Sequence, residues 1–316
     1  MKPRIFIDGA AGTTGLEIRQ RLEGRTELAV ASLSGSERKE SEARTRALNE
    51  SDIAILCLPD QAAREAVALI ENPAVRVLDA STAHRTAAAW VYGFPELEPG
   101  RRGEIAAAQR VSNPGCYSTG FLALVRPLVR EGILPADFPL SANAVSGYSG
   151  GGKAMIEEFE SAAPACLAKP VVRTYALTLA HKHVPEMQVH AGLNHPPVFA
   201  PSVGRYYRGM IVEVPLQLWA LPGNRSAATV HTVFADTYAG QPLVHVEPLA
   251  HPADTATLDA ELLKNSDRMK LFVFGNERTR QARLVAVLDN LGKGASGAAV
   301  QNLNIMLGLP EGTGLH

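Results

Sequence analysis

The sequence predicts an α/β fold, in which a Rossmann-type parallel-sheet domain is followed by an α+β domain built on a mixed sheet. Four short apolar runs in the first hundred residues are each separated by enough chain for a helix, which is the rhythm of βαβ units. The expected strands are residues 4–8, 27–33, 52–58 and 75–79. Beyond about residue 115 the apolar runs become longer and partly alternating, which indicates a mixed or antiparallel sheet.

The composition is that of an ordinary globular protein whose partner is a small molecule. At roughly 150 residues per domain, the 316 residues make about two compact units. The 31 basic and 32 acidic residues nearly cancel, so no overall field is available to hold nucleic acid or an anionic membrane. No run approaches the roughly 20 apolar residues of a membrane span. Three widely spaced cysteines without a CxxC pair predict a reducing, cytoplasmic location and no disulfide framework.

Beyond residue 115, longer apolar patterns in the sequence predict the remaining helices and strands. Residues 116–130 are expected to form a helix that Pro127 kinks or ends locally. The expected strands of the mixed sheet are residues 138–150, 208–221 and 226–240. Residues 292–309 open with glycines and continue as a terminal helix that docks back on the first domain. The expected domains are therefore residues 1–115 with 293–316, and residues 116–292.

A glycine-rich turn, GAAGTTG, directly follows the first expected strand and opens the first helix. Gly9, Gly12 and Gly15 would let backbone amides approach a pyrophosphate, and the helix N-terminus would add partial positive charge. Thr13 and Thr14 can add hydroxyl donors. A structural turn without a ligand is the alternative, because a glycine pattern alone is weak evidence. Its position at the first βα turn favours a dinucleotide site.

The end of the second expected strand bears on the choice of nucleotide. Sites selective for NAD usually carry Asp or Glu there, whereas this stretch reads SLSGSERK. The hydroxyl of Ser34 and the cation of Arg38 suit a 2′-phosphate, so we expect NADP. Glu37 and Glu40 leave open a solvated helix start with mixed charges.

Cys116 lies in the segment SNPGCYSTG, where a turn that includes Asn113 precedes the expected helix. A thiol in the first turn of a helix is favoured as the nucleophilic thiolate, and the same N–H groups can stabilise an oxyanion. The alternative is that Cys116 is buried and packs like a small apolar residue, as most free cysteines do. Cys57 fits that alternative well, and Cys166 has no catalytic context.

The segment HKHVPEMQVH is the richest titratable cluster in the chain. His181, His183 and Glu186 are candidates for acid/base or substrate-binding work beside a thiolate. Pro185 and Glu186 predict the start of a helix whose carboxylate orients a histidine. Metal binding and a solvated surface are the alternatives, and we expect no metal. The residues do not rank His181 against His183.

Taken together, these features resemble the shorter N-acetyl-γ-glutamyl-phosphate reductases and, more distantly, aspartate-semialdehyde dehydrogenases. The matching pieces span nearly the whole chain: GAAGTTG, DASTAHRT, YGFPEL, SNPGCYSTG, SGYSGGGK, HKHVPE and DNLGKGASGAAVQNLN. The segment DASTAHRT departs from the commoner DLSADFR-type stretch, with His84 where an aromatic or acidic residue stands.

The resemblance implies a Rossmann domain, a mixed-sheet catalytic domain that also forms the subunit contacts, and a homodimer or homotetramer. It implies NADPH-dependent reduction of an acyl phosphate through a thioester on Cys116, with Gly294 and Ser296 near the nicotinamide. The substrate carries a phosphate and an α-carboxylate, so cations should anchor it. The candidate substrate-binding residues are Arg85, Asn113, Lys153, Arg173 and Tyr175. Another acyl-phosphate reductase, or a non-catalytic NADPH sensor, remains the alternative.

Overall fold

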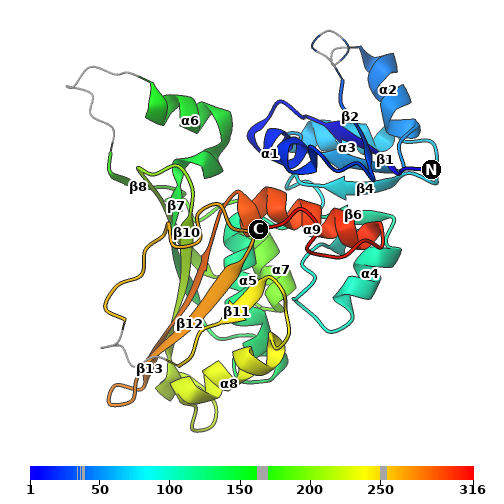
Figure 1. Cartoon of the computed structure of the whole chain (residues 1–316). Helices are drawn as coiled ribbons and strands as arrows, with labels where there is room; N and C mark the ends of the chain where they lie inside the picture. Colours follow the sequence, from blue (N-terminus) through cyan, green and yellow to red (C-terminus); the bar gives the residue numbers. More distant parts are fainter. Residues whose placement is uncertain (34, 36, 38–39, 162–169, 250–254) are drawn as a thin grey trace. The chain divides into compact units, whose positions relative to one another are not determined.

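The computed structural model describes the chain except residues 34, 36, 38–39, 162–169 and 250–254 (Figure 1). The chain divides into two compact units, which are described separately. The first comprises residues 1–114 and 295–316, and the second comprises residues 115–294. In the part of the chain that the structure describes, no helix is long and apolar enough to span a bilayer.

The first unit contains a six-stranded sheet in the order β2-β1-β3-β4-β6-β5, and every pair of neighbours is parallel. Its strands are β1 (Arg4–Asp8), β2 (Ala29–Ala31), β3 (Ile53–Leu56), β4 (Arg76–Asp79), β5 (Val91–Tyr92) and β6 (Arg110–Ser112). Its helices are α1 (Thr13–Leu22), α2 (Ser41–Asn49), α3 (Asp60–Ala68), α4 (Arg101–Ala107) and α9 (Gly297–Met306). The predicted parallel-sheet domain is confirmed.

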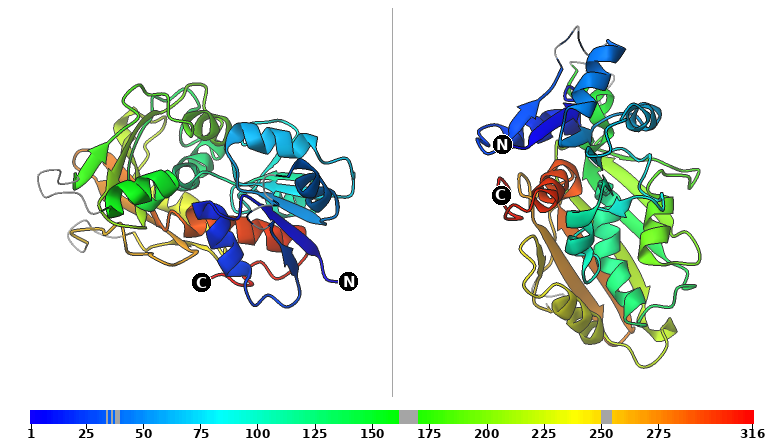
Figure 2. Two further views of the ribbon diagram at one scale, coloured as in Figure 1. Left: turned by 90° about the horizontal axis from the view of Figure 1, so that it is seen from above. Right: turned by 90° about the vertical axis from the view of Figure 1, so that its right-hand side faces the viewer.

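Apolar residues on both faces of this sheet are covered by helices, as alternating βαβ units require. One core joins β1 and β3 to Ile18 of α1 and Leu303 of α9, and the other joins β3 and β4 to Leu48 and Ala63. Figure 2 shows α9 beside α1. Arg76 of β4 donates to the carbonyls of Ile105 and Met306, at the ends of α4 and α9, where a cation is favoured.

The second unit contains a seven-stranded mixed sheet in the order β11-β12-β13-β10-β7-β9-β8, which confirms the predicted sheet type. Its strands are β7 (Ser141–Gly147), β8 (Val172–Thr174), β9 (Val198–Gly204), β10 (Met210–Gln217), β11 (Val244–Val246), β12 (Met269–Asn276) and β13 (Gln281–Leu288). Its helices are α5 (Cys116–Arg130), α6 (Gly152–Glu160), α7 (Val184–Ala191) and α8 (Ala227–Thr237). Short helical turns are η2 (Tyr148–Gly151), η4 (Leu218–Ala220) and η5 (Gly292–Ser296).

The prediction of a strand at residues 226–240 is wrong, because this segment forms α8. Ser226 caps the helix by accepting the N–H of Thr229, and Thr229 accepts the N–H of Ser226 in return. Val230 and Phe234 are buried four residues apart on one helix face. The partly alternating apolar run favoured a strand locally, but the cap and the helical spacing of the buried residues prevail.

Pro127 does not end α5, which continues to Arg130. A proline cannot donate to the carbonyl four residues earlier, so the carbonyl of Ala123 loses its helical partner. The hydroxyl of Tyr238 donates to that carbonyl at 2.8 Å. A buried carbonyl left unpaired would cost about 1–3 kcal/mol, so this contact makes the proline tolerable within the helix.

Candidate active site

The predicted dinucleotide loop joins β1 to α1, at the carboxyl edge of the parallel sheet. The first hydrogen bond of α1 runs from Leu16 N–H to the carbonyl of Gly12 at 2.8 Å. Three residues of the first turn, Thr13, Thr14 and Gly15, come before Leu16 in the chain. Their N–H groups therefore have no acceptor within the helix. They form a place where an anion is stabilised by hydrogen bonds and by the helix dipole.

The three glycines of this loop serve different purposes. A Cβ on Gly9 would lie 2.2 Å from the carbonyl oxygen of Cys57, and one on Gly15 would lie 2.4 Å from the carbonyl oxygen of Gly9. The fold itself therefore requires these two glycines. A Cβ on Gly12 would meet Gly9 only at an ordinary 3.5 Å. The packing of the fold does not require a glycine at position 12. The space beside Gly12 instead suits the close approach of a pyrophosphate to the backbone.

A cluster of polar groups follows β4 at the same edge of this sheet. Asp79 is fully buried and accepts both the N–H and the hydroxyl of Ser81. His84 Nδ1 lies 2.6 Å from Asp79 Oδ2, and its ring stacks on Trp90 at 4.1 Å. Arg85 is buried and donates to the carbonyl of Asn113 at 2.9 Å. Both Arg85 and Asn113 lie in the first unit, where they hold the chain that follows β4 and β6.

In the second unit, Cys116 is the first residue of α5, as predicted. The first helical bond of α5 joins Thr119 N–H to the carbonyl of Gly115, so the N–H groups of residues 116–118 lack an acceptor within the helix. Glu186 is buried on α7, and its Oε1 accepts the N–H of Gly115 at 2.8 Å. This contact ties α7 to the residue that precedes Cys116. The predicted orientation of a histidine by Glu186 stays a prediction.

An aromatic cluster surrounds the start of α5. The hydroxyl of Tyr175 donates to that of Tyr117 at 3.1 Å, and Tyr117 donates to the carbonyl of Ser202 at 3.3 Å. Burial raises the pKa of Tyr175 to about 12, and the nearby charge of Cys116 adds to the rise. Burial likewise holds the pKa of Tyr117 well above its usual value. Both phenols therefore stay protonated at neutral pH, and each donates its single hydrogen within this cluster beside the thiol.

The two candidate histidines differ in environment. The ring of His181 lies against those of Tyr117, Tyr175 and His183, with centroids 5.8, 5.7 and 4.7 Å away. His181 Nδ1 accepts the backbone N–H of His183 at 3.1 Å, so a neutral His181 carries its proton on Nε2. His181 is half-buried, whereas His183 is only 5% exposed and precedes α7 as its cap.

Gly294, predicted near the nicotinamide, packs against Cys116. A Cβ on Gly294 would lie 2.8 Å from Cys116 Cβ and 3.1 Å from the carbonyl oxygen of Asp289. Its N–H donates to that same carbonyl at 3.0 Å. The surface against Cys116 at this point is therefore bare backbone. Ser296 lies in the first unit, where its hydroxyl accepts Arg21 Nε at 3.0 Å.

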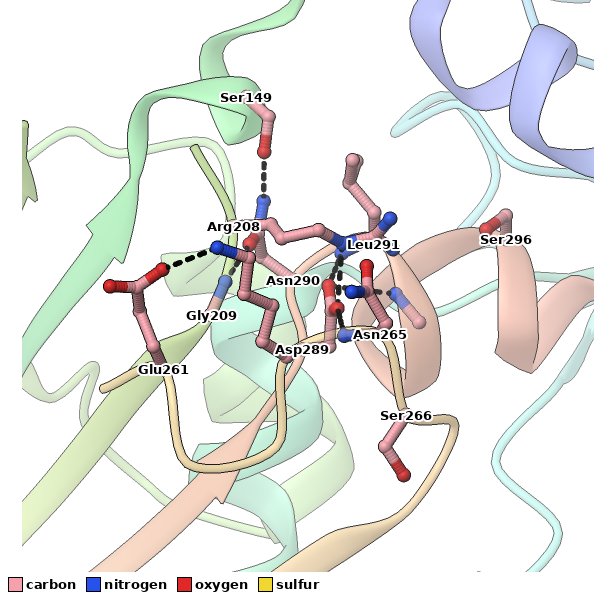
Figure 3. A network of polar contacts seen from close by, with 12 residues as sticks. Ser149, Arg208, Gly209, Glu261, Asn265, Ser266, Asp289, Asn290, Leu291 and Ser296 are labelled. Atoms are coloured by element: carbon pink, nitrogen blue, oxygen red, sulfur yellow. Dashed lines mark hydrogen bonds and ion pairs between the residues drawn. The ribbon is translucent and has the colours of Figure 1, made fainter. Parts of the chain in front are cut away.

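The loop that carries Gly294 is held by two consecutive side chains, Asp289 and Asn290 (Figure 3). The buried Asp289 carboxylate accepts Arg208 Nε at 2.7 Å and the backbone N–H groups of Asn265, Leu291 and Gly292. Asn290 accepts the N–H of Gly209 and donates to Ser149. Four donors compensate the cost of burying the carboxylate, so the loop has one defined course.

The remaining predicted substrate anchors lie around α6. Lys153 is exposed and lies 3.6 Å from Glu157, and Arg173 of β8 pairs with Glu158 at 2.6 Å. No described contact brings either cation to Cys116, whereas Tyr175 does lie beside it. Ser34, Arg38 and Cys166 lie outside the described residues. Among the residues that are described, no group of His, Cys, Asp and Glu could hold a metal ion.

Sequence reasoning missed Tyr117, Asp289 and Asn290. Tyr117 directly follows Cys116, and this position is the signal that the sequence offers for it. Asp289 and Asn290 begin the DNLGKGASG segment, but their partners Arg208 and Ser149 lie 81 and 141 residues away. No local pattern connects such distant residues.

Comparison with known proteins first defines the class. Residues 4–105 match the family model described as the NAD binding domain of semialdehyde dehydrogenase, and residues 116–290 match its dimerisation domain. Aspartate semialdehyde dehydrogenase II of Vibrio cholerae, solved as a complex with ASA, has a TM-score of 0.71 at 16% identity, covering 97% of this chain and 98% of that one. The enzyme of Francisella tularensis gives 0.70 at 13% identity, covering 96% and 100%. These likenesses establish a semialdehyde dehydrogenase fold with a nicotinamide dinucleotide domain.

Closer relatives define the family. An N-acetyl-γ-glutamyl-phosphate reductase 2 of Nostoc sp. is 54% identical over 99% of both chains. A reductase of the same name from Brucella anthropi is 56% identical over 98% of this chain and 99% of its own. The chain belongs to the N-acetyl-γ-glutamyl-phosphate reductase family and is an oxidoreductase, which confirms the resemblance stated from its motifs.

We expect Gly294→Ala to slow alkylation of Cys116 by iodoacetamide about ten- to a hundredfold, because the new methyl group displaces the thiol or its neighbouring backbone. The rate is measured by intact mass over time. Gly103→Ala on α4 is the matched control, because its Cβ would meet open space. An unchanged rate in Gly294→Ala would show that the bare backbone against Cys116 has no part in the reactivity of the thiol.

Proposed function

We propose that this protein reduces N-acetyl-γ-glutamyl phosphate with NADPH to N-acetylglutamate 5-semialdehyde and inorganic phosphate, a step of arginine biosynthesis. The observation that carries the proposal is Cys116 as the first residue of α5, beside donor hydroxyls and the bare backbone of Gly294. The names of the relatives at 54% and 56% identity supply the substrate.

Cys116 acts as the nucleophile. The dipole at the N-terminus of α5 stabilises its thiolate, which attacks the acyl carbon of the substrate. A C–S bond forms, the bond from carbon to the phosphate oxygen breaks, and inorganic phosphate leaves with the bonding electrons. The product is a thioester on Cys116. The backbone N–H groups at residues 116–118 are placed to stabilise the oxyanion of this step.

The second half of the reaction reduces the thioester. NADPH held at the N-terminus of α1 would supply the hydride that reduces the thioester carbon. The resulting oxyanion on the Cys116 adduct re-forms its C=O bond and expels the thiolate, which releases the aldehyde. His181 holds a proton on Nε2 and exchanges it with that oxygen or with the sulfur. We assign this role to His181 rather than His183 because His181 is half-buried and its tautomer is fixed.

We propose NADP as the form of the cofactor, held at the N-terminus of α1 by Gly9, Gly12, Thr13, Thr14 and Gly15. The space over Gly12 supports this placement. The case for the 2′-phosphate rests on the sequence of Ser34 and Arg38. Arg85, Asn113, Lys153, Arg173 and Tyr175 stay proposed substrate contacts. A cytoplasmic location is supported by Cys57 and Cys116, which are thiols and not halves of a disulfide.

We also propose a homodimer in which a second copy covers the part of the mixed-sheet face that stays exposed around Asn143 and Ala200, because Leu258, Ala260 and Leu263 of the same chain already cover Val285. Helices α5 and α8 pack on β10, β12 and β13, and the opposite face carries a row that runs across five strands. Pairing register places these residues in line: Phe272, Val285, Glu213, Asn143 and Ala200. A hollow of about 490 Å³ adjoins the row at Ile211, Phe274 and Arg283. The name of the matching family model, a dimerisation domain, supports this assembly.

The reverse reaction tests the proposed function. We expect NADP, phosphate and N-acetylglutamate semialdehyde to give NADPH in a phosphate-dependent reaction, followed by absorbance. Cys116→Ala should lose at least about a thousandfold in rate while still binding NADPH, because it removes the covalent route. If aspartate semialdehyde is turned over faster than N-acetylglutamate semialdehyde, the proposed substrate is wrong. No turnover with either aldehyde, despite tight NADPH binding, would indicate a sensor.

The assignment of the histidines gives a separate prediction. His181→Asn should lower turnover about a hundred- to ten-thousandfold while the protein stays folded and binds NADPH. His183→Asn should chiefly lower the free energy of unfolding, because this side chain is buried. Denaturant titration and steady-state kinetics separate the two effects. A folded His183→Asn variant that is inactive, beside an active His181→Asn variant, would reverse the assignment.

The proposed dimer is tested by placing a long charged side chain on the open sheet face. Ala200→Arg should convert the dimer to a monomer in light scattering, because the exposed Ala200 has no room for an arginine beneath a second copy. Ala228→Arg, on the exposed side of α8, is the control and should stay dimeric. A dimer that persists in Ala200→Arg would place the interface elsewhere.

A further inference from the structure

An acidic residue stands at the phosphate-binding loop, where it should oppose the binding of anions. Asp8 is the last residue of β1 and directly precedes Gly9. Its side chain is only 11% exposed, and its backbone carbonyl accepts the N–H of Cys57, which keeps this end of β1 against the chain after β3. A carboxylate at this point repels a dinucleotide that brings several phosphate charges to the adjacent N–H groups.

The charge of Asp8 also acts on a residue outside β1. Burial raises the pKa of the Cys57 thiol to about 12, and the charges of Asp79 and Asp8 contribute to the rise. Two carboxylates, at the ends of β1 and β4, thus place negative charge at the edge of the sheet where the nucleotide is proposed to bind. Asp79 has His84 at 2.6 Å, so its charge has a partner close by.

Asp8 has a partner of its own on α2. Arg44 Nε donates to Asp8 Oδ2 at 2.7 Å, and the Arg44 side chain is 19% exposed. Arg44 Nη2 also donates to the carbonyl of Ala62 on α3 at 3.2 Å. The guanidinium is therefore fixed between β1, α2 and α3, and a permanently charged group lies against the carboxylate beside the loop.

We propose that Arg44 sets the affinity for the dinucleotide by neutralising Asp8, so that the loop presents its N–H groups to the phosphates without an opposing charge. Arg44 is a positioning residue in this account, because it acts through Asp8 and does not contact the phosphates. The inference rests on the proposed NADPH site and adds a determinant of affinity that lies outside the glycine motif.

The test is a double-mutant cycle on NADPH binding, measured by fluorescence titration with no substrate present. Arg44→Gln should raise the Kd for NADPH about tenfold, because it leaves an unopposed charge near the phosphates. Asp8→Asn should bind NADPH within about threefold of the parent protein, because Arg44 already neutralises Asp8 in the parent. The double variant should return to within about threefold of the parent, since no charge is left to neutralise.

The controls separate charge from structure. Arg102→Gln breaks the Arg102–Glu311 pair, which has the same 2.7 Å separation in the same unit, and should leave the Kd unchanged. If Arg44→Gln alone fails to fold, the comparison of Asp8→Asn with the double variant still decides, because equal affinities are required. Weaker binding by the double variant than by Asp8→Asn would mean that Arg44 holds the phosphates directly, which overturns the proposal.

Two other outcomes also overturn the proposal. If Asp8→Asn and Arg44→Gln weaken NADPH binding equally, the ion pair serves only to hold the structure together. If Arg44→Gln leaves the Kd for NADPH unchanged, Arg44 has no part in binding. A parent protein that binds no NADPH would instead overturn the proposed function.

Discussion

The first turn of an α-helix leaves N–H groups without an acceptor in the helix, and this constraint places both halves of the proposed chemistry. In the first unit, α1 begins at the end of a glycine turn after β1. In the second, α5 begins at Cys116 directly after the turn that includes Gly115. One helix start suits the phosphates of a dinucleotide, and the other suits a thiolate and the oxyanion that forms beside it. Both proposed sites thus use the N-terminus of a helix to stabilise negative charge.

Each helix start depends on contacts that keep it open. At α1, a required glycine on either side of Gly12 leaves the backbone of Gly12 accessible. At α5, the buried carboxylate of Glu186 accepts the N–H of Gly115 and fixes the residue before the helix start. Asp289 and Asn290 fix the loop that brings Gly294 against Cys116. Buried polar groups of the second unit thus hold the two segments that lie against Cys116.

The sequence predicts the fold class and the position of the nucleophile because both depend on local patterns. The strand at residues 4–8 and the helix start at Cys116 occur where predicted. The strand prediction for residues 226–240 is wrong because a partly alternating apolar run also fits a helix, and the cap at Ser226 and the buried helix face favour α8. The partners of Asp289, and the pairing of Tyr175 with Tyr117, join residues far apart in the chain, so only the tertiary structure reveals them. The proposed assignment of His181 as the proton donor rests on the hydrogen bond that its Nδ1 accepts from the His183 N–H, and the spacing of the sequence does not reveal this bond.

The central claim is that Cys116 carries the acyl group as a thioester between loss of phosphate and reduction. The most direct measurement mixes the protein with N-acetyl-γ-glutamyl phosphate in the absence of NADPH, and follows released phosphate and intact protein mass together. The account predicts about one equivalent of phosphate per active site, with an N-acetylglutamyl adduct on the peptide that contains Cys116, and its loss on addition of NADPH. Phosphate release without an adduct, or an adduct on another residue, would contradict it.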